Sequence, residues 1–433
     1  MLQADTARRR NDLSPPNGRL DKKRHSPMVD KLSAPHVVLL TGKYSVGGIR
    51  RYCDDLSETL AGLGHQVSII SVGNEASIEP AARTARVRIL PLRIKTPQGT
   101  LRHLLGMARF LAKMKPDVIL LNHCFCLSPG LALLPRKTRI VPVLHTDYEV
   151  AYRKTLANPL NWNVAIAPSP GIQRAAQAYC QKRPVICIPH GVHTCALETL
   201  TSLRAPHRQD PFRLCYVGRI EQQKGVLLIP EILAATRQQS LHIHCTFIGD
   251  GDARPAVEKR VAELDLQKHV TFLGMVQPDK IADYLFDQHV LLAPSNFEGF
   301  GLTIVEAQSC GCVPVASHLP GVTDFTVNAG DSGFLVSPRT PPRFAEAIAK
   351  LYHDPDLWSH FSHAGWELVK QKFSLERMGL NYRKLVQDLL ADCYPLPLKY
   401  HSRVPISPEF FFSAEDGIFP SLARRAIRRL QWR

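Results

Sequence analysis

Two glutamates, Glu298 and Glu306, are spaced so that their carboxylates could bind one ligand together. Glu298 lies in a loop between an expected strand and an expected helix, and Glu306 lies about one turn into that helix, so both carboxylates can border one pocket. Carboxylates bind neighbouring hydroxyls well, and a ribose and a hexose each present such hydroxyls, so each glutamate would bind one sugar. The loop glycines allow close approach to the backbone. The loop residues expected beside the two glutamates are Gly299, Phe300, Gly301 and Leu302.

Basic and glycine residues at two other loops suit a diphosphate. Arg219 and Lys224 are five residues apart in the loop after the expected strand 214–217. An arginine fork and a lysine point charge at the carboxyl end of a strand would neutralise a departing pyrophosphate. Gly47 and Gly48 open a helix after the first strand, where backbone N–H groups can approach a phosphate. A solvated charged loop and a simple tight turn are the structural alternatives.

The elements that must position these residues alternate between strands and helices. Because short apolar runs alternate with amphipathic stretches, the sequence predicts parallel sheets with helices on both faces. A polar stretch at about 196–210 interrupts this order, which then restarts. The sequence therefore predicts an α/β protein with two Rossmann-like domains whose sheets face each other across a cleft. The expected strands are 37–41, 67–72, 118–122, 140–144, 164–168 and 185–189, then 214–217, 243–248, 270–273, 290–293 and 313–316.

Composition limits the class of protein. The chain has 433 residues, of which 45% are hydrophobic and 21% charged, as expected for two soluble domains without a membrane span. Nine of its sixteen net positive charges lie in residues 1–35 and 421–433. That distribution favours an anionic surface as partner over nucleic acid. Eleven cysteines without a paired framework, and the lack of an apolar signal segment, predict a cytoplasmic protein.

Metal binding is not expected. Two close cysteine pairs, Cys124/Cys126 beside His123 and Cys310/Cys312, lack a second ligand pair at zinc spacing, so they are interpreted as small core residues at strand ends.

Taken together and in order, these motifs resemble the retaining glycosyltransferases of family 4, which have the GT-B fold, over about residues 36–391. The chain departs from the family at His190, where asparagine is usual, and at His193, where an acid is usual. The segments that carry the resemblance are Gly47-Gly48, 64–67, 116–119, 188–192, the Arg219/Lys224 loop, 249–251 and the Glu298/Glu306 pair.

The resemblance implies roles for individual residues. In the family, the residues that match Arg219 and Lys224 bind the donor diphosphate, the match of Glu306 binds the ribose, and the match of Glu298 binds the transferred sugar and is discussed in catalysis. His145, after the expected strand 140–144, matches a histidine near the reacting sugar, although histidines at strand ends are often structural. The resemblance also makes Asp250 and Asp252 part of a turn, so no cofactor or essential divalent metal is expected.

Composition and the order of the elements, together with the resemblance, predict a domain plan. It comprises a disordered basic leader, an acceptor-side domain, a linker, a nucleotide-sugar donor domain, a closing helix and a proline-containing basic tail. An amphipathic helix at 419–433 in that tail would lie on an anionic membrane. The expected boundaries of these six parts are 1–34, 35–195, 196–210, 211–375, 376–391 and 392–433.

The sequence is thus interpreted as a retaining, hexosyltransferase-type enzyme that moves a sugar from a nucleotide-diphosphate donor to a glycan or lipid-linked acceptor. Surface polysaccharide, lipopolysaccharide or glycolipid assembly is its expected setting, on the inner face of the cytoplasmic membrane. Two alternatives stay open: a GT-B epimerase or other nucleotide-sugar enzyme, and a non-enzymatic basic protein that binds membrane or nucleic acid. The donor base, the sugar and the acceptor are left open.

Overall fold

The computed structural model describes most of the region between Ala34 and Leu396. The expected amphipathic helix 419–433, the pair Cys124/Cys126 and all of the expected leader except Ala34 lie outside the described residues. The described residues are 34–42, 47–71, 87–92, 101–122, 131, 134–135, 137–146, 149–156, 159–203 and 210–396.

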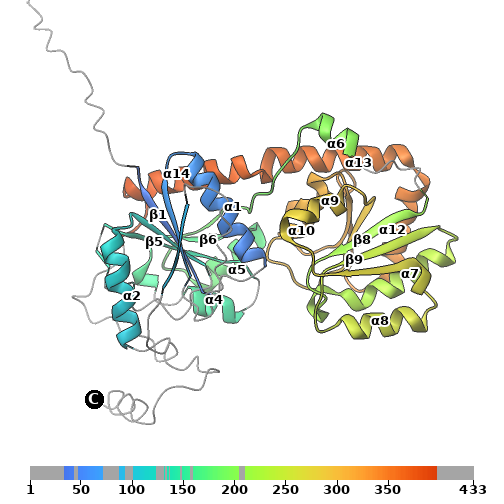
Figure 1. Ribbon diagram of the computed structural model, residues 1–433, viewed down its shortest axis with the longest axis horizontal. Helices are drawn as coiled ribbons and strands as arrows, with labels where there is room; N and C mark the ends of the chain where they lie inside the picture. Colours follow the sequence, from blue (N-terminus) through green and yellow to red (C-terminus); the bar gives the residue numbers. More distant parts are fainter. Residues whose placement is uncertain are drawn as a thin grey trace, which may run out of the picture. The chain divides into compact units, whose positions relative to one another are not determined.

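The first half of the chain forms a parallel sheet with the strand order β3-β2-β1-β4-β5-β6-β7 (Figure 1). Its central strands are continuous runs of valine, isoleucine and leucine because helices cover both faces. The strands are β1 (His36–Thr41), β2 (Gln66–Ser71), β3 (Val87–Pro91), β4 (Val118–Asn122), β5 (Arg139–Val143), β6 (Ala165–Ala167) and β7 (Val185–Cys187). The helices include α1 (Gly48–Gly62), α2 (Leu101–Met114), α4 (Glu149–Thr155) and α5 (Pro170–Tyr179).

The second half forms another parallel sheet, with the order β10-β9-β8-β11-β12-β13. Its core packs the aromatic rings of Phe212, Phe247 and Trp358 among aliphatic side chains. The strands are β8 (Phe212–Val217), β9 (Ile243–Ile248), β10 (Val270–Gly274), β11 (Val290–Ala293), β12 (Val313–Ser317) and β13 (Phe334–Val336). The helices include α7 (Ile229–Gln238), α8 (Arg254–Glu263), α9 (Ile281–Leu285), α10 (Leu302–Ser309), α11 (Thr323–Thr326), α12 (Pro341–His353) and α13 (Pro355–Leu368).

In each sheet, the chain builds strands outward to one side of its starting strand and then crosses over to build them on the other side. In the first sheet this crossover point lies between β1 and β4, and in the second between β8 and β11. Loops that leave neighbouring parallel strands in opposite directions open a crevice at the carboxyl ends of those strands. The loops after β1, β8 and β11 carry Gly47, Lys224 and Glu298, so the topology places the predicted site residues at these two crevices.

The chain returns to the first sheet after completing the second. A π-helix, Val369–Phe373, joins α13 to α14 (Leu375–Leu390), and α14 lies beside α1 (Figure 1). The side chains of Met378 and Tyr382 on α14 are buried in the same cluster as Tyr52 of α1. Hydrogen bonds from Val192 N to Phe373 O at 2.8 Å and from Leu375 N to Val192 O at 3.1 Å tie the two crossing segments together.

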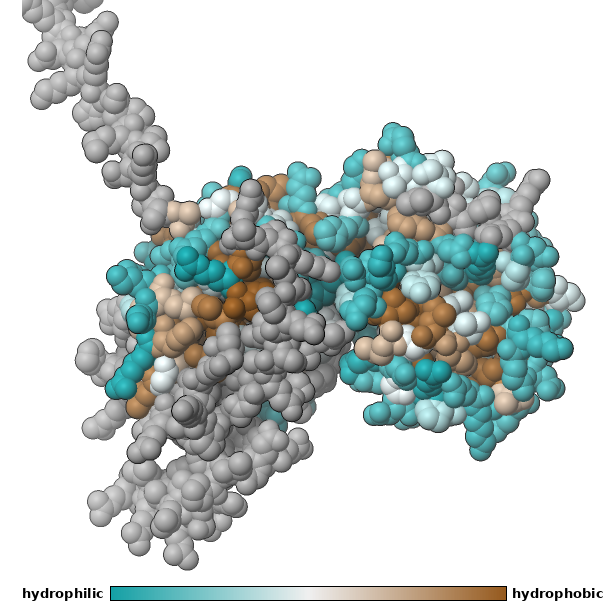
Figure 2. All heavy atoms as spheres, in the orientation of Figure 1, coloured by the Kyte–Doolittle hydropathy of each residue, from teal (hydrophilic) through white to brown (hydrophobic). Residues whose placement is uncertain are grey.

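The predicted fold class, two Rossmann-like α/β domains with parallel sheets, is confirmed. The structure adds elements that the sequence patterns did not reveal, among them β3, β13, α13 and a short helix, α6 (Leu197–Leu203), inside the expected linker. None of the helices in the described part of the chain combines the length and the hydropathy needed to cross a bilayer. On the face drawn in Figure 2, apolar side chains of the described residues form small groups among hydrophilic ones.

Candidate active site

Glu298 is held by two side chains of its own domain. Lys224 Nζ lies 2.8 Å from Glu298 Oε1, and Ser295 Oγ donates a hydrogen bond to the same oxygen at 2.8 Å. The Glu298 side chain is only 13% exposed and that of Lys224 25%, so the pair is largely shielded from water. The loops after β8 and β11 are also joined by a hydrogen bond from Asn296 N to Gln223 O at 3.0 Å. The carboxylate and the ammonium group predicted from separate motifs therefore form one unit.

Arg219 lies in the same loop as Lys224 but has a different partner. The Tyr216 hydroxyl donates to the Arg219 carbonyl at 2.6 Å, which fixes the backbone at the start of the loop. The Arg219 guanidinium pairs with Glu221 and is 67% exposed. The structure therefore brings Lys224, and not Arg219, into contact with Glu298.

Gly225 fixes the position of Lys224 through its backbone conformation. It has φ of +66°, and a Cβ added there would lie 1.9 Å from the Pro294 carbonyl oxygen. This close approach joins the end of the Lys224 loop to the start of the Glu298 loop.

We expect Gly225→Ala to lower the free energy of unfolding more than Gly274→Ala does. Both positions have positive φ, which costs an alanine roughly 1–2 kcal/mol. At Gly274 the nearest atom to an added Cβ is 3.8 Å away, whereas at Gly225 the clash with Pro294 adds about 1–3 kcal/mol. Urea unfolding of both variants measures the difference, and equal losses would show that the contact with Pro294 does not constrain the loop.

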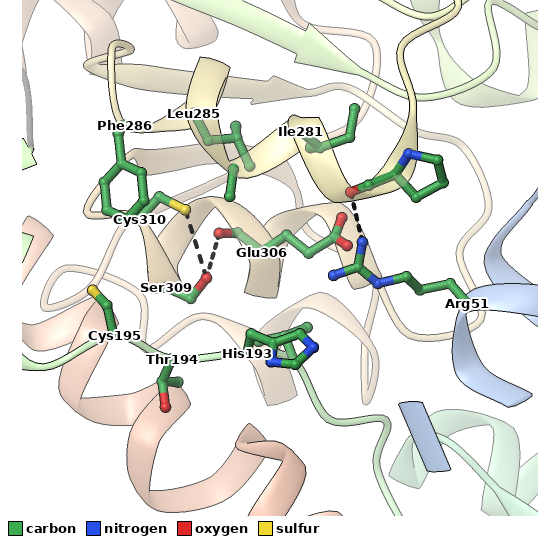
Figure 3. Close-up of a pocket in the computed structure, with 13 residues that line it drawn as sticks. Arg51, His193, Thr194, Cys195, Ile281, Leu285, Phe286, Glu306, Ser309 and Cys310 are labelled. Carbon is green, nitrogen blue, oxygen red and sulfur yellow. Dashed lines mark hydrogen bonds between the residues drawn. The ribbon is translucent and has the colours of Figure 1, made fainter. Parts of the chain in front are cut away.

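Glu306 lies apart from Glu298, in a cavity of about 190 Å³ (Figure 3). The cavity is lined by Arg51 from α1, by His193 and the residues that follow it, by Pro278 and Ile281, and by the Glu306 side of α10. Glu298 is not among its lining residues. Burial raises the pKa of Glu306 to about 7; the positive charge of Arg51 opposes that rise and the negative charge of Asp55 adds to it.

The glycines at the start of α1 leave room for a ligand. Helix α1 begins at Gly48, with Gly47 as the residue before it. Among the described residues, no atom lies within 4 Å of the position that a Cβ would occupy at either glycine. A phosphate could therefore approach this helix end closely.

His145 lies just beyond β5 among aromatic side chains. Its Nε2 is 3.0 Å from Asn122 Oδ1, and its ring stacks on that of His190 with a centroid distance of 5.4 Å. The backbone of His145 approaches the Glu298 loop, because a Cβ added at Gly299 would be 2.3 Å from the His145 carbonyl oxygen. Burial lowers the pKa of His190 to about 4, so that ring is neutral at neutral pH.

The remaining loop residues serve the structure of the site. Phe300 is 3% exposed and packs against His190 and Phe373, so it can reach a donor only through its backbone. Leu302 packs against the hydrophobic cluster that contains Phe300 and Phe373. Gly301 precedes α10 with φ of +82°. Ser169 Oγ donates to the Gly299 carbonyl at 2.9 Å and so connects α5 to this loop.

The acidic and cysteine residues considered as metal ligands take part in ordinary structural contacts. Asp250 accepts a hydrogen bond from Gly251 N at 2.8 Å and pairs with Arg254 at 3.2 Å. Cys310 and Cys312 are buried in a hydrophobic cluster. Within the described ranges no group of three or more histidine, cysteine, aspartate or glutamate side chains is placed to hold a metal ion.

Sequence reasoning missed several residues that shape the site. Ser295 holds Glu298, Arg51 of α1 lines the Glu306 cavity, and the negative charge of Asp55 on α1 acts on the pKa of Glu306. Arg51 and Asp55 are four residues apart, as are Tyr52 and Leu56 on the buried face of α1. The sequence signal that could have indicated them is a charged residue at a position on the apolar face of an amphipathic helix, where charged residues are rare.

Comparisons with known proteins identify a family and a fold. The pattern of the glycosyl transferases group 1 matches residues 202–367, and that of glycosyltransferase family 4 matches residues 46–195. The alpha-D-kanosaminyltransferase of Streptomyces kanamyceticus is 30% identical over 38% of this chain and 42% of its own length. The chain therefore spans less than half the length of this curated relative.

Solved structures show the same fold. The sucrose-phosphate synthase of Thermosynechococcus elongatus superposes with a TM-score of 0.69 at 22% identity, over 82% of this chain and 99% of that protein. Anabaena HepE, solved in complex with UDP, has a TM-score of 0.64 at 18% identity, over 82% of this chain and all of that protein.

Proposed function

Because the chain belongs to the group 1 glycosyltransferases of the family 4 type, we propose that it transfers a sugar from a nucleotide diphosphate to an acceptor hydroxyl. The observation that carries this proposal is the Lys224–Glu298 pair at the crevice of the second sheet, with Glu306 on the helix that follows. In such a pair the lysine can bind a diphosphate, and the carboxylate can bind the hydroxyls of the sugar attached to it. Complexes of HepE with UDP and with UDP and glucose support a donor of this class.

The donor would extend across three groups of the second domain. In this proposal Glu306 accepts hydrogen bonds from the ribose, and Lys224, assisted by Arg219, contacts the diphosphate. Glu298 contacts the transferred hexose. The N-terminal end of α1, at Gly47 and Gly48, faces the phosphates from the first domain, and His145 lies beside the reacting sugar.

The proposed transfer retains the anomeric configuration. The bond between the anomeric carbon and the diphosphate breaks, while the acceptor oxygen forms its new bond on the same face of the ring. The acceptor proton passes to a phosphate oxygen, so this scheme needs no enzyme base. Lys224 stabilises the charge that develops on the leaving group, and Glu298 stabilises the positive charge that develops on the sugar ring.

The proposal extends to the acceptor and to the cellular setting, which rest on the class of enzyme alone. We propose a glycan or lipid-linked acceptor, bound on the side of the first domain, and a role in surface polysaccharide or glycolipid assembly. Docking on the inner face of the cytoplasmic membrane would bring the enzyme to a lipid-linked acceptor. Sequence similarity to glycosyltransferases supports the class of reaction but not the identity of the acceptor.

A donor screen tests the proposed activity. UDP-, GDP- and ADP-sugars would be compared by thermal unfolding and by slow hydrolysis, each with and without EDTA. At ~100 times its dissociation constant the right donor adds about 2.7 kcal/mol to the free energy of unfolding. We expect one base to stand out and EDTA to have no effect, and proton NMR of the glycoside product gives the anomeric configuration. If no nucleotide sugar stabilises the protein or turns over, the proposal is wrong.

A further inference from the structure

Arg51 of α1 extends from the first domain to a carbonyl group of the second. Its Nη1 donates a hydrogen bond to the Pro278 carbonyl at 2.6 Å, and its Nε donates to Asp55 Oδ2 at 3.1 Å. The Asp55 side chain is only 5% exposed, so Arg51 forms an ion pair with a buried carboxylate of its own helix. The guanidinium group therefore has a fixed position at the Glu306 cavity.

Glu306 faces this guanidinium group across the cavity (Figure 3). Among the residues that the structure describes, none donates a hydrogen bond to the Glu306 carboxylate. Its backbone carbonyl is engaged, because Ser309 Oγ donates to it at 2.7 Å. An unpaired carboxylate at a cavity is suited to accept hydrogen bonds from the hydroxyls of a ligand.

Burial makes the charge on Glu306 costly. It raises the pKa of Glu306 to about 7, and Asp55, the second carboxylate near Arg51, pushes in the same direction. Arg51 is the positive charge that acts against both effects. Without it a larger fraction of Glu306 would be protonated at neutral pH, because a buried carboxylate loses its nearest counter-charge.

We infer that Arg51 is a positioning residue for Glu306: from across the cavity its positive charge favours the ionised carboxylate, which accepts hydrogen bonds from two hydroxyls of the donor ribose. The inference rests on the proposed function in taking a nucleotide as the ligand. It assigns to the first domain a part in binding the nucleoside end of the donor. Loss of Arg51 should therefore act on nucleotide affinity through the protonation of Glu306.

Other titratable groups line the cavity or lie next to a residue that does. Asp55 on α1 pairs with His193, whose Nε2 is 3.5 Å from Asp55 Oδ1. Burial raises the pKa of the Cys195 thiol and raises that of Cys310 to about 12, so both thiols are neutral near pH 7. Helix α9 contributes the apolar side chains of Ile281, Ala282 and Leu285. Because the chain has many carboxyl groups, the signal of Glu306 must be assigned by mutation.

The first measurement follows the Glu306 carboxylate itself and needs no nucleotide. Infrared difference spectra of the full chain with ¹³C-labelled glutamate give carboxyl titrations, and the band lost in Glu306→Gln identifies Glu306. We expect Arg51→Gln to raise the midpoint of that titration by about one pH unit, the low end for an opposite charge at close range. Arg51→Lys should restore much of the original midpoint, because it keeps the charge.

Arg50→Gln is the matched control. It removes the same charge from the same turn of α1, where Arg50 Nε lies 3.6 Å from Asp54. We expect it to leave the Glu306 titration unchanged. Thermal unfolding of each variant shows whether it folds, and Arg51→Lys keeps the test usable if Arg51→Gln does not.

The second measurement is the affinity for UDP and for GDP by calorimetry between pH 6 and 8.5. For Arg51→Gln we expect about fivefold weaker binding at pH 7, the drop in the ionised fraction of Glu306 when its pKa rises by one unit, and recovery towards the wild-type affinity at pH 8.5, where the carboxylate ionises again. An affinity reduced by the same factor at every pH, or an unchanged Glu306 titration, would overturn the inference. If the titration shifts but neither nucleotide binds the wild-type protein, the role of Arg51 stands and the proposed function fails.

Discussion

Replacement of Glu298 by glutamine is expected to lower turnover about 10²–10³-fold, the usual loss for one preorganised electrostatic contact. The amide has nearly the same size as the carboxylate, so it can still accept hydrogen bonds from Lys224 and Ser295. What disappears is the negative charge next to a sugar ring that gains positive charge in the proposed transition state. Nucleotide affinity should therefore change much less than turnover, because that charge acts mainly in the transition state.

Glu306→Gln provides the comparison for this prediction. Ribose does not change during transfer, so loss of the Glu306 charge should weaken nucleotide binding more than it slows the chemical step. Calorimetry gives the affinities, and single-turnover rates with the donor found in the screen give the chemical step. If Glu298→Gln keeps near-normal turnover while Glu306→Gln abolishes it, the two carboxylates have been assigned the wrong way round.

Local sequence patterns were sufficient to predict two parallel sheets and to place Lys224 and Glu298 after strands of the second one, although the contact between the two side chains was not predicted. The apolar runs at β8 and β11 are long enough to recognise, and their neighbouring positions bring the loops that follow them together. Lys224 and Glu298 are 74 residues apart, yet each is placed by the end of its own strand. Such positions follow from the topology of a parallel sheet, which the alternation of strands and helices already indicates.

Contacts between the two halves could not be predicted in the same way. Arg51 and Pro278 are 227 residues apart, and their hydrogen bond depends on how the first turn of α1 packs against the segment before α9. No periodic pattern encodes that packing. The same holds for the close approach of Gly299 to the His145 backbone, which appears in the sequence only as one more loop glycine. Short elements such as β13, with three residues, lack a pattern of their own.

Replacement of Lys224 by alanine is expected to weaken nucleotide binding and to lower turnover together. In the proposed mechanism the ammonium group contacts the diphosphate in the ground state and more strongly as the diphosphate departs, so both quantities depend on it. We expect a loss of turnover of about 10²–10³-fold or more. Arg219→Ala should have a smaller effect, because Arg219 is mostly exposed and pairs with Glu221. Lys280→Ala is the control for loss of one positive charge from an exposed pair in this domain.

The double variant Lys224→Ala/Glu298→Gln separates the two roles that Lys224 could have. If Lys224 acts only by holding Glu298, the double variant should be no worse than the more affected single variant, since contacting residues that act as a unit are not additive. If Lys224 also contacts the diphosphate, the double variant should bind UDP or GDP clearly more weakly than Glu298→Gln alone. We expect the second result. An unchanged nucleotide affinity in Lys224→Ala would show that the lysine serves the carboxylate and not the donor.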